Sequence, residues 1–338
     1  MKENGGNIII WHTNKNSFRG AELRKNPKKR IIVYGDSNIQ AEFSNLENTF
    51  ARKLEKYLSS DDLTDIEVVN AGIFGFGPDQ NLIRFKNEAN LYHPNLVIFH
   101  IFADNDFGDI LRNRLFRLDE NGELIRSDYK FTIDEFNSRR SKTFKSFYLS
   151  NLLTLRAIKK LFQSKNEEEH IIDILQKQTE KEYSTYKDKE SRPGMEFGDH
   201  YDIDIALNPE QESSKMKIKL MEEVLKKANY FARSKNIEFL VLIQPSVMDL
   251  TKENFFLNYI YFQKYPNYQR TNLTNAVEKI CASHNIKYIN LFEVFKNSSP
   301  EQLYFRGGNN HWNDLGQDIA ARETASLIYK REMLNDKY

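Results

Sequence analysis

Segments with the pattern of buried strands alternate with segments of helical periodicity along most of this 338-residue chain, and this alternation constrains the fold more than any other feature. The clearest strands are the continuous apolar runs at 30–34 and 96–101, which are typical of strands covered on both faces. Five strands are predicted, at 30–34, 66–69, 96–101, 237–243 and 287–291, and five helices, at 48–59, 78–90, 213–234, 272–283 and 314–330. This pattern predicts a flavodoxin-like, three-layer α/β/α fold around a five-stranded parallel sheet.

The alternation is interrupted between residues 109 and 212, a segment too long for an ordinary connection. It contains a hairpin pattern at 116–125, a predicted helix at 152–163 and a charged stretch at 165–189 that has the pattern of a solvated helical face. We therefore expect one domain spanning residues 1–338, with a mainly helical insertion at 109–212. The insertion is predicted to be a lid or a substrate wall, with a partner surface as the alternative.

Composition argues against several classes of partner. Forty-nine Lys and Arg residues against 48 Asp and Glu leave a formal net charge of +1, which gives no electrostatic footprint for nucleic acid or an anionic membrane. The longest apolar runs are far shorter than the ~20 residues that span a bilayer, so no transmembrane segment is predicted. A lone cysteine, Cys281, permits neither an internal disulfide nor a cysteine-based zinc site.

The N-terminal residues lack the apolar run of a signal peptide. This predicts a cytoplasmic location, or a periplasmic or secreted one if an N-terminal signal or anchor has been removed.

Three polar motifs follow the first three predicted strands. Gly35-Asp36-Ser37 follows the first, residues 70–75 (Asn-Ala-Gly-Ile-Phe-Gly) follow the second, and Asp104-Asn105-Asp106 follow the third. A Gly-Asp-Ser triplet alone is a weak signal, because Asp and Ser favour turns and caps. However, the carboxyl ends of parallel strands meet at one edge of the sheet. Acyl transfer needs donors for a developing oxyanion, and the Gly75 N–H and the Asn105 amide can supply them beside the Ser37 N–H.

A serine hydroxyl is a poor nucleophile until a nearby base takes its proton, and histidine is the usual base. Of the seven histidines, only His311 follows the last predicted strand, in a loop at 307–316 that leads into the final helix. His100 falls inside a predicted buried strand, and the others fall in helix ends, connections or unassigned segments. His311 is therefore the predicted base.

Taken together, these blocks resemble the GDSL/SGNH hydrolase superfamily, whose members carry Ser, Gly, Asn and His in this order. Segments 16–20 and 70–80, together with Asn105-Asp-Phe, are similar to a bacterial subgroup with a large insertion after the third block. The resemblance implies Ser37 as nucleophile, Ser37, Gly75 and Asn105 as the oxyanion hole, and His311 as general base. It also implies ester substrates on lipids, carbohydrates or small molecules, with no cofactor; we expect no metal.

The chain departs from this family just before the histidine. Members carry an Asp two or three residues upstream that orients the imidazole, and here those positions hold Asn309 and Gly308. An Asn309 amide oxygen can hold the ring instead, or a backbone carbonyl can do so in a dyad. Natural divergence, an engineered inactivation and a lost activity are all consistent with this change.

We therefore predict a serine ester hydrolase that works through an acyl-enzyme. The alternatives are an O-acyltransferase that uses a sugar hydroxyl as acceptor, and a catalytically weakened binding module for acylated ligands.

Three weaker signals are also present. The glycine pattern at 72–77 has neither the order of a dinucleotide fingerprint nor the Lys-Ser/Thr of a P-loop. The cluster Asp199-His200-x-Asp202-x-Asp204 is expected to be a solvated loop, with a divalent-ion site as the alternative. Seven aromatic residues at 255–268 predict core packing or self-association in preference to a wall for acyl chains or sugar rings.

Overall fold

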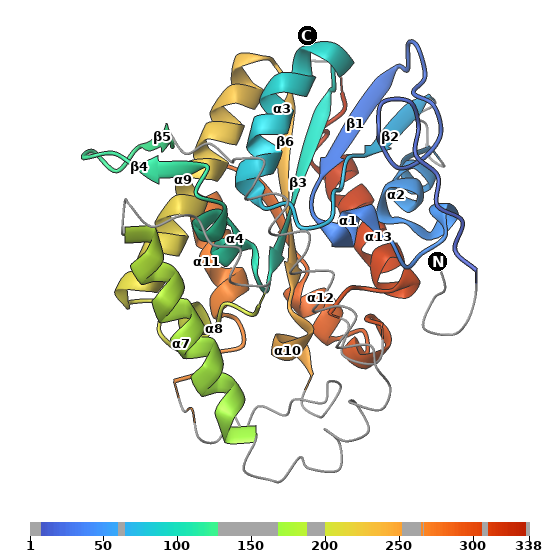
Figure 1. The fold of residues 1–338 in the computed structure, drawn as a ribbon. Coiled ribbons are helices and arrows are strands. Elements are labelled where there is room, and N and C mark those ends of the chain that lie inside the picture. Colours follow the sequence, from blue (N-terminus) through green and yellow to red (C-terminus); the bar gives the residue numbers. More distant parts are fainter. Residues whose placement is uncertain are drawn as a thin grey trace.

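The computed structural model describes residues 8–59, 65–127, 168–187, 200–251, 265, 267–305 and 310–335, with the side chains of 168–173 left aside. Its centre is a five-stranded sheet in which all neighbouring strands run parallel (Figure 1). The strand order is β2-β1-β3-β6-β7, with bounds β1 Lys29–Tyr34, β2 Ile66–Asn70, β3 Leu96–Ala103, β6 Glu238–Pro245 and β7 Lys287–Asn290. The predicted five-stranded parallel sheet is confirmed, each predicted strand is present, and the strand order is that of a flavodoxin-like fold.

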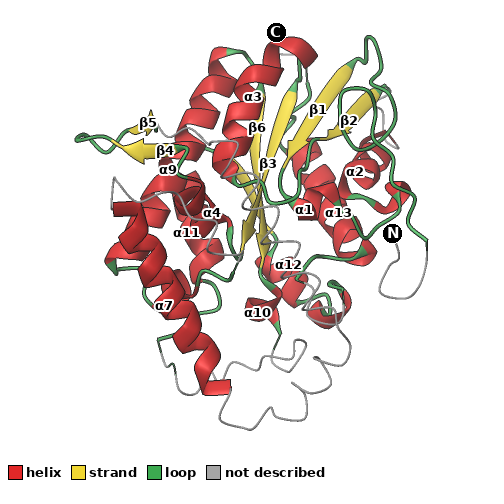
Figure 2. Ribbon diagram, in the orientation of Figure 1, coloured by secondary structure: helices red, strands yellow, loops and turns green. Residues whose placement is uncertain are grey.

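Helices cover both faces of the sheet, which completes the three layers (Figure 2). One face carries α3 Pro78–Tyr92, α4 Asp106–Asn113, α9 Glu212–Ser234 and α11 Asn272–Ser283. The other carries α2 Phe50–Ser59, α12 Phe292–Lys296 and α13 Asp314–Lys330. The central strands β1, β3 and β6 are mostly apolar because both of their faces are buried in this way.

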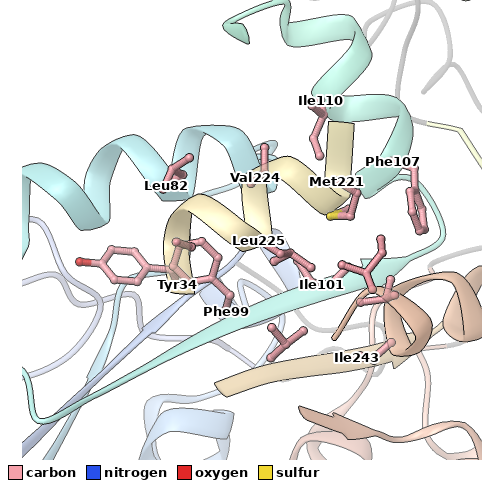
Figure 3. Packing of buried hydrophobic residues seen from close by; sticks show 14 of the residues in the cluster. Tyr34, Leu82, Phe99, Ile101, Phe107, Ile110, Met221, Val224, Leu225 and Ile243 are labelled. Carbon is pink, nitrogen blue, oxygen red and sulfur yellow. The ribbon is translucent and has the colours of Figure 1, made fainter. Parts of the chain in front are cut away.

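Alternate residues of each strand pack into two separate apolar clusters. In β3, Val97 and Phe99 face the α3/α9 side, whereas Leu96 and Ile98 face the α2/α13 side. Figure 3 shows part of the first cluster, where the helices α3, α4 and α9 meet the sheet. The labelled members are Tyr34, Phe99, Ile101 and Ile243 from strands, and Leu82, Phe107, Ile110, Met221, Val224 and Leu225 from helices. The helical members of α9 recur at helical spacing, so the same periodicity that predicts the helix also forms the core.

In the second cluster, α13 packs against α2. Ala320, Ala321 and Ala325 present small side chains on the buried face of α13, which lets it approach the larger Phe50 and Leu54 of α2 closely. This packing fixes the start of α13, and the loop that precedes α13 carries His311.

The segment 109–212 contributes several elements at one side of the sheet. Residues 116–126 form the predicted hairpin, with β4 Phe116–Leu118 antiparallel to β5 Leu124–Arg126. Further along lie α7 Glu168–Lys187, which packs on α4, and α8 Ile203–Leu207, which packs on α7, α9 and α11 (Figure 1). The helix predicted at 152–163 lies outside the described residues.

Part of α7 lies outside the predicted solvated face at 165–189, because Thr179 and Glu182 are buried. Within the described part of the chain, no helix combines the length and the apolar character needed to cross a membrane.

Candidate active site

Ser37 is the first residue of a one-turn helix, α1 Ser37–Gln40, that begins two residues after β1 ends. Asp36 caps this helix, because its Oδ1 accepts the backbone N–H of Asn38 at 2.8 Å. The loop after β2 packs against α1 so closely that a Cβ on Gly72 would lie 2.3 Å from the Gln40 nitrogen. Glycine at 72 therefore permits the approach that brings the two strand ends together.

Ser37 and His311 are in direct contact although 274 residues separate them. The Ser37 Oγ lies 2.7 Å from the His311 Nε2. The His311 ring also meets Phe43 edge-on, with 5.6 Å between ring centroids. Two backbone contacts hold the loop that carries His311. The Phe305 N–H donates to the His311 carbonyl at 3.0 Å, and Tyr304 forms an isolated antiparallel β-bridge with Trp312. The arrangement is that of a hydroxyl and the base that can take its proton.

The Gly75 loop is tied to the segment that carries Ser37. The Ile73 N–H donates to the Gly35 carbonyl at 3.1 Å, and the Phe74 N–H donates to the Gln40 Oε1 at 2.9 Å. Gly75 itself has a φ of +70°, a left-handed conformation that favours glycine. Apart from its chain neighbours, no atom of the described residues lies within 4 Å of where its Cβ would be. The backbone of this loop thus borders open space beside α1.

Asn105 stands at the N-terminus of α4, directly beyond the end of β3. Its side chain is buried, and its Oδ1 has no hydrogen-bond partner among the described residues. A buried polar group without a partner calls for an explanation. The Oδ1 can only accept a hydrogen bond, so a donor role toward a ligand would fall to the Nδ2 of the same amide.

Asn309 and Gly308 lie outside the described residues. The neighbouring Asn310 is described, and its Nδ2 donates to the Asp104 Oδ1 at 3.4 Å. The other Asp104 oxygen accepts the Ser246 hydroxyl at 2.5 Å. Burial raises the pKa of Asp104 to about 7, although the Ser246 hydrogen bond acts in the opposite direction.

A second buried acid lies beside Asp104 and was missed at the level of sequence. The Asp249 Oδ1 accepts the hydroxyls of Tyr201, at 2.6 Å, and of Tyr268. Burial raises the pKa of Asp249 to about 8, and the charge of Asp104 acts in the same direction. These acids come from distant segments that share no local motif. Of the aromatic stretch 255–268, Tyr268 is buried here as predicted for core packing, whereas residues 255–262 lie outside the described residues.

His100 lies on β3 beneath the Asp36-Ser37 turn and is fully buried. Its Nε2 lies 2.8 Å from the Gln244 Oε1, and its Nδ1 lies 3.5 Å from the Asp36 Oδ1. Burial lowers the pKa of His100 even though Asp36 and Gln244 act to raise it. The His100 ring therefore lies in the sheet next to the Asp36-Ser37 turn.

The expectation of a solvated loop at 199–204 is wrong for the part that the structure describes. Asp202 and Asp204 are buried, and the Lys217 Nζ lies 2.7 Å from the Asp202 Oδ1 and 3.0 Å from the Asp204 Oδ1. His200 pairs with Glu182 at 2.7 Å. No group of three His, Cys, Asp or Glu residues in the described segments is arranged to hold a metal ion. The acids serve as partners of a buried lysine because a buried charge requires pairing.

A residue of the segment 16–20 stabilises α1 through hydrogen bonds. Arg19 is buried, and its guanidinium donates to the carbonyls of Gln40 and Ala41 at the carboxyl end of that helix and of Ser44 in the turn that follows. The sequence singled out this segment, and the structure shows that it fixes the short helix on which Ser37 stands.

No family model matches this chain, and no curated protein matches it. Solved structures do match. A lipase/acylhydrolase from Enterococcus faecalis is 11% identical, with 90% of this chain and 96% of that chain covered and a TM-score of 0.43. A lipolytic protein described as of the G-D-S-L family, from Desulfitobacterium hafniense, is 12% identical, with 88% and 99% covered and a TM-score of 0.41.

An acetylxylan esterase from Geobacillus stearothermophilus is 10% identical, with 93% of this chain and 98% of that chain covered and a TM-score of 0.44. The motifs of the chain resemble those of the GDSL/SGNH hydrolases, and they stand at the strand ends of a five-stranded parallel sheet. Because these TM-scores lie below 0.5, we base the functional proposal on the geometry of the site.

Proposed function

We propose that this protein is a serine ester hydrolase of the SGNH type. The observation that carries the proposal is the 2.7 Å contact between the Ser37 Oγ and the His311 Nε2 at the carboxyl edge of the sheet. A nucleophile and a base within hydrogen-bond reach are the minimum for covalent acyl transfer. The Gly75 loop and Asn105 stand at the neighbouring strand ends, where oxyanion donors are needed.

In the proposed mechanism, the Ser37 Oγ attacks the ester carbonyl carbon while the His311 Nε2 takes the hydroxyl proton. The tetrahedral oxyanion accepts hydrogen bonds from the Ser37 and Gly75 N–H groups and from the Asn105 amide. Collapse of this intermediate breaks the bond to the leaving alcohol, which receives the proton from His311. Water then attacks the acyl-enzyme by the same route and releases the acid.

The proposed substrate is an acylated lipid, carbohydrate or small molecule. Phe43, which is half-buried and contacts the His311 ring, offers an apolar surface beside the reacting atoms. We also propose that residues 109–212 form an insertion within one domain that borders the site. The support is that α4 begins directly after Asn105 and that α7 packs on α4.

Labelling with a fluorophosphonate, followed by mass mapping of the modified residue, tests the nucleophile. Modification of Ser37 with loss of turnover on a short-chain chromogenic ester is the expected result, and Ser37→Ala should lose both. Ser44→Ala is the matched control, since this buried serine lies seven residues on and its hydroxyl accepts the Gln317 amide at 2.7 Å. Full turnover by Ser37→Ala would remove the assignment.

The same assay separates the remaining alternatives. A burst of alcohol release followed by slower acid release supports the hydrolase. Acyl transfer to an added sugar would favour the O-acyltransferase, and an inert protein that still binds acylated ligands would favour the binding module.

A further inference from the structure

We propose that Asn38 is a positioning residue that holds the His311 loop in register with the Ser37 turn. This inference rests on the proposed function, because the register matters for turnover only if Ser37 and His311 react together. Asn38 follows Ser37 directly, and its partner Trp312 follows His311 directly. The residue next to the nucleophile is thus bonded to the residue next to the base.

Two hydrogen bonds join Asn38 to Trp312. The Trp312 backbone N–H donates to the Asn38 Oδ1 at 3.3 Å, and the Trp312 indole Nε1 donates to the Asn38 carbonyl at 3.0 Å. Both residues are 1% exposed. Because water does not compete for these groups, the bonds resist sliding of one segment past the other.

The Asn38 side-chain amide also forms hydrogen bonds to a residue of the sheet and to the residue that caps α1. Its Oδ1 also accepts the Gln244 Nε2 at 3.2 Å, and its Nδ2 donates to the Asp36 Oδ2 at 3.2 Å. Gln244 in turn contacts His100 at 2.8 Å. The Asn38 side chain therefore has a fixed orientation set by residues of α1, β6 and β3, and it is not free to follow a moving loop.

The Trp312 side chain is also held in place by packing against α2. Its ring stacks on Phe50 of α2, with 5.9 Å between centroids and 14° between planes. The loop that carries His311 is thus held between a helix and the Asn38 amide. The 2.7 Å contact from His311 to Ser37 is the result of this placement, and a misplacement of about 1 Å can reduce turnover by ~10²-fold.

A purely structural role for Asn38 predicts a different outcome from a positioning role. A structural residue changes the fraction of folded protein, whereas a positioning residue changes kcat in protein that remains folded. Loss of an interaction that acts on the reacting geometry should lower kcat and kcat/KM together and leave KM unchanged.

The experiment compares Asn38→Leu, Trp312→Phe and their combination with the parent. Asn38→Leu keeps the side-chain size and removes the amide, and Trp312→Phe keeps an aromatic ring against Phe50 and removes the indole N–H. Asn38→Leu should lower kcat and the rate of fluorophosphonate labelling by ~10²-fold with KM unchanged. The effects of the two single variants should combine non-additively, because both remove parts of one contact.

Gln317→Leu is the matched control. Gln317 is also a buried amide with two hydrogen bonds, accepting the Phe50 N–H at 3.0 Å and donating to the Ser44 hydroxyl at 2.7 Å, but it bonds neither α1 nor the loop at 310–312. It should lose stability and keep kcat. The positioning role is overturned if Asn38→Leu keeps the parental kcat and labelling rate, or if Gln317→Leu loses kcat to the same extent at equal folded fraction.

Failure of the proposed function gives a distinct result. In that case Ser37→Ala keeps turnover, and the readout for Asn38 becomes the NMR signals of the His311 ring. If Asn38→Leu shifts those signals in the same direction as Ser37→Ala does, the register role stands without the catalytic one. Unchanged signals in Asn38→Leu overturn it.

Discussion

Asn105 combines two features that distinguish a site residue from a structural one. Its backbone carbonyl has a structural role, since it accepts the Asp109 N–H at 2.9 Å. Its buried side-chain oxygen has no hydrogen-bond partner among the described residues. At the level of single residues, the proposed chemistry depends on the Nδ2 donor of this amide, which the end of β3 places at the carboxyl edge of the sheet.

Asn105→Ala should lower kcat by roughly 10²–10³, the typical loss of one oxyanion donor, with little change in KM. Steady-state kinetics on a short-chain ester measure this. Asn113→Ala is the matched control, because Asn113 lies at the other end of α4 and bonds Asp79 and Gln80 instead. A change confined to KM would make Asn105 a substrate-positioning residue.

Asn309→Asp should raise kcat by a factor of ten or more, because an amide cannot offset the imidazolium charge that forms on His311. Loss of the orienting carboxylate of a serine triad reduces kcat by about 10⁴. Gly308→Asp tests the position one residue earlier. If neither variant gains activity and the parent is already fast, the orienting group lies elsewhere.

At the level of elements, α4 is joined to α7 by buried charge. The Arg112 guanidinium lies 2.5 Å from Asp109 on its own helix and 3.2 Å from Glu182 of α7, and Glu182 also pairs with His200. Burial acts to lower the pKa of His200, but the hydrogen bond and the charge of Glu182 raise it above its ordinary value. Glu182 therefore attaches α7 to α4, the helix that begins after Asn105.

Glu182→Gln should lower the free energy of unfolding by ~3 kcal/mol, because it leaves Arg112 with one partner fewer in a buried setting. The loss should be larger at pH 6 than at pH 8. A histidine whose pKa is raised on folding contributes stability that is present below its unfolded value of 6.5 and is lost as the pH rises through the folded value.

Urea denaturation at the two pH values measures this loss. Glu210→Gln, in the exposed pair with Lys215, is the control and should change stability by less than about 1 kcal/mol. An equal loss in both variants would contradict a special role for Glu182.

At the level of the whole molecule, buried acids with raised pKa values make stability depend on pH, and Asp104 and Asp249 are two of them. Burial raises the pKa values of Asp104 and Asp249 to about 7 and about 8, from 3.8 in the unfolded chain. Between these values the native state binds protons that the unfolded state has released. The free energy of unfolding should therefore fall as the pH rises from about 4 to about 8.

Asp249→Asn should make this fall shallower, by at most about 1.4 kcal/mol per pH unit. The Asn oxygen can still accept the hydroxyls of Tyr201 and Tyr268. Relative to the parent, the variant should gain stability between pH 5 and pH 8, as measured by thermal or urea unfolding. Asp65→Asn is the control, since Asp65 is exposed and Asn tolerates its positive φ. An unchanged pH slope in Asp249→Asn would show that Asp249 is not protonated in the native state.

The sequence by itself determined the strands, the five longest helices of the sheet layers and the edge at which Ser37, Asn105 and His311 stand. The physical reason is that apolar periodicity reports burial locally, and parallel strands must end at a common edge. Helices α11 and α13 have the predicted bounds for the same reason.

Only the tertiary structure decided which distant side chains meet. The 2.7 Å contact of Ser37 with His311, the bonds from Asn38 to Trp312 and the pairing of Asp202 with Lys217 join residues that share no local pattern. The sequence predicted solvent-exposed positions for Glu182 and Asp202, but both residues are buried. A charged residue is buried only when a partner from another segment compensates for its lost hydration. Such compensation depends on how helices and strands pack, which no local window of sequence contains.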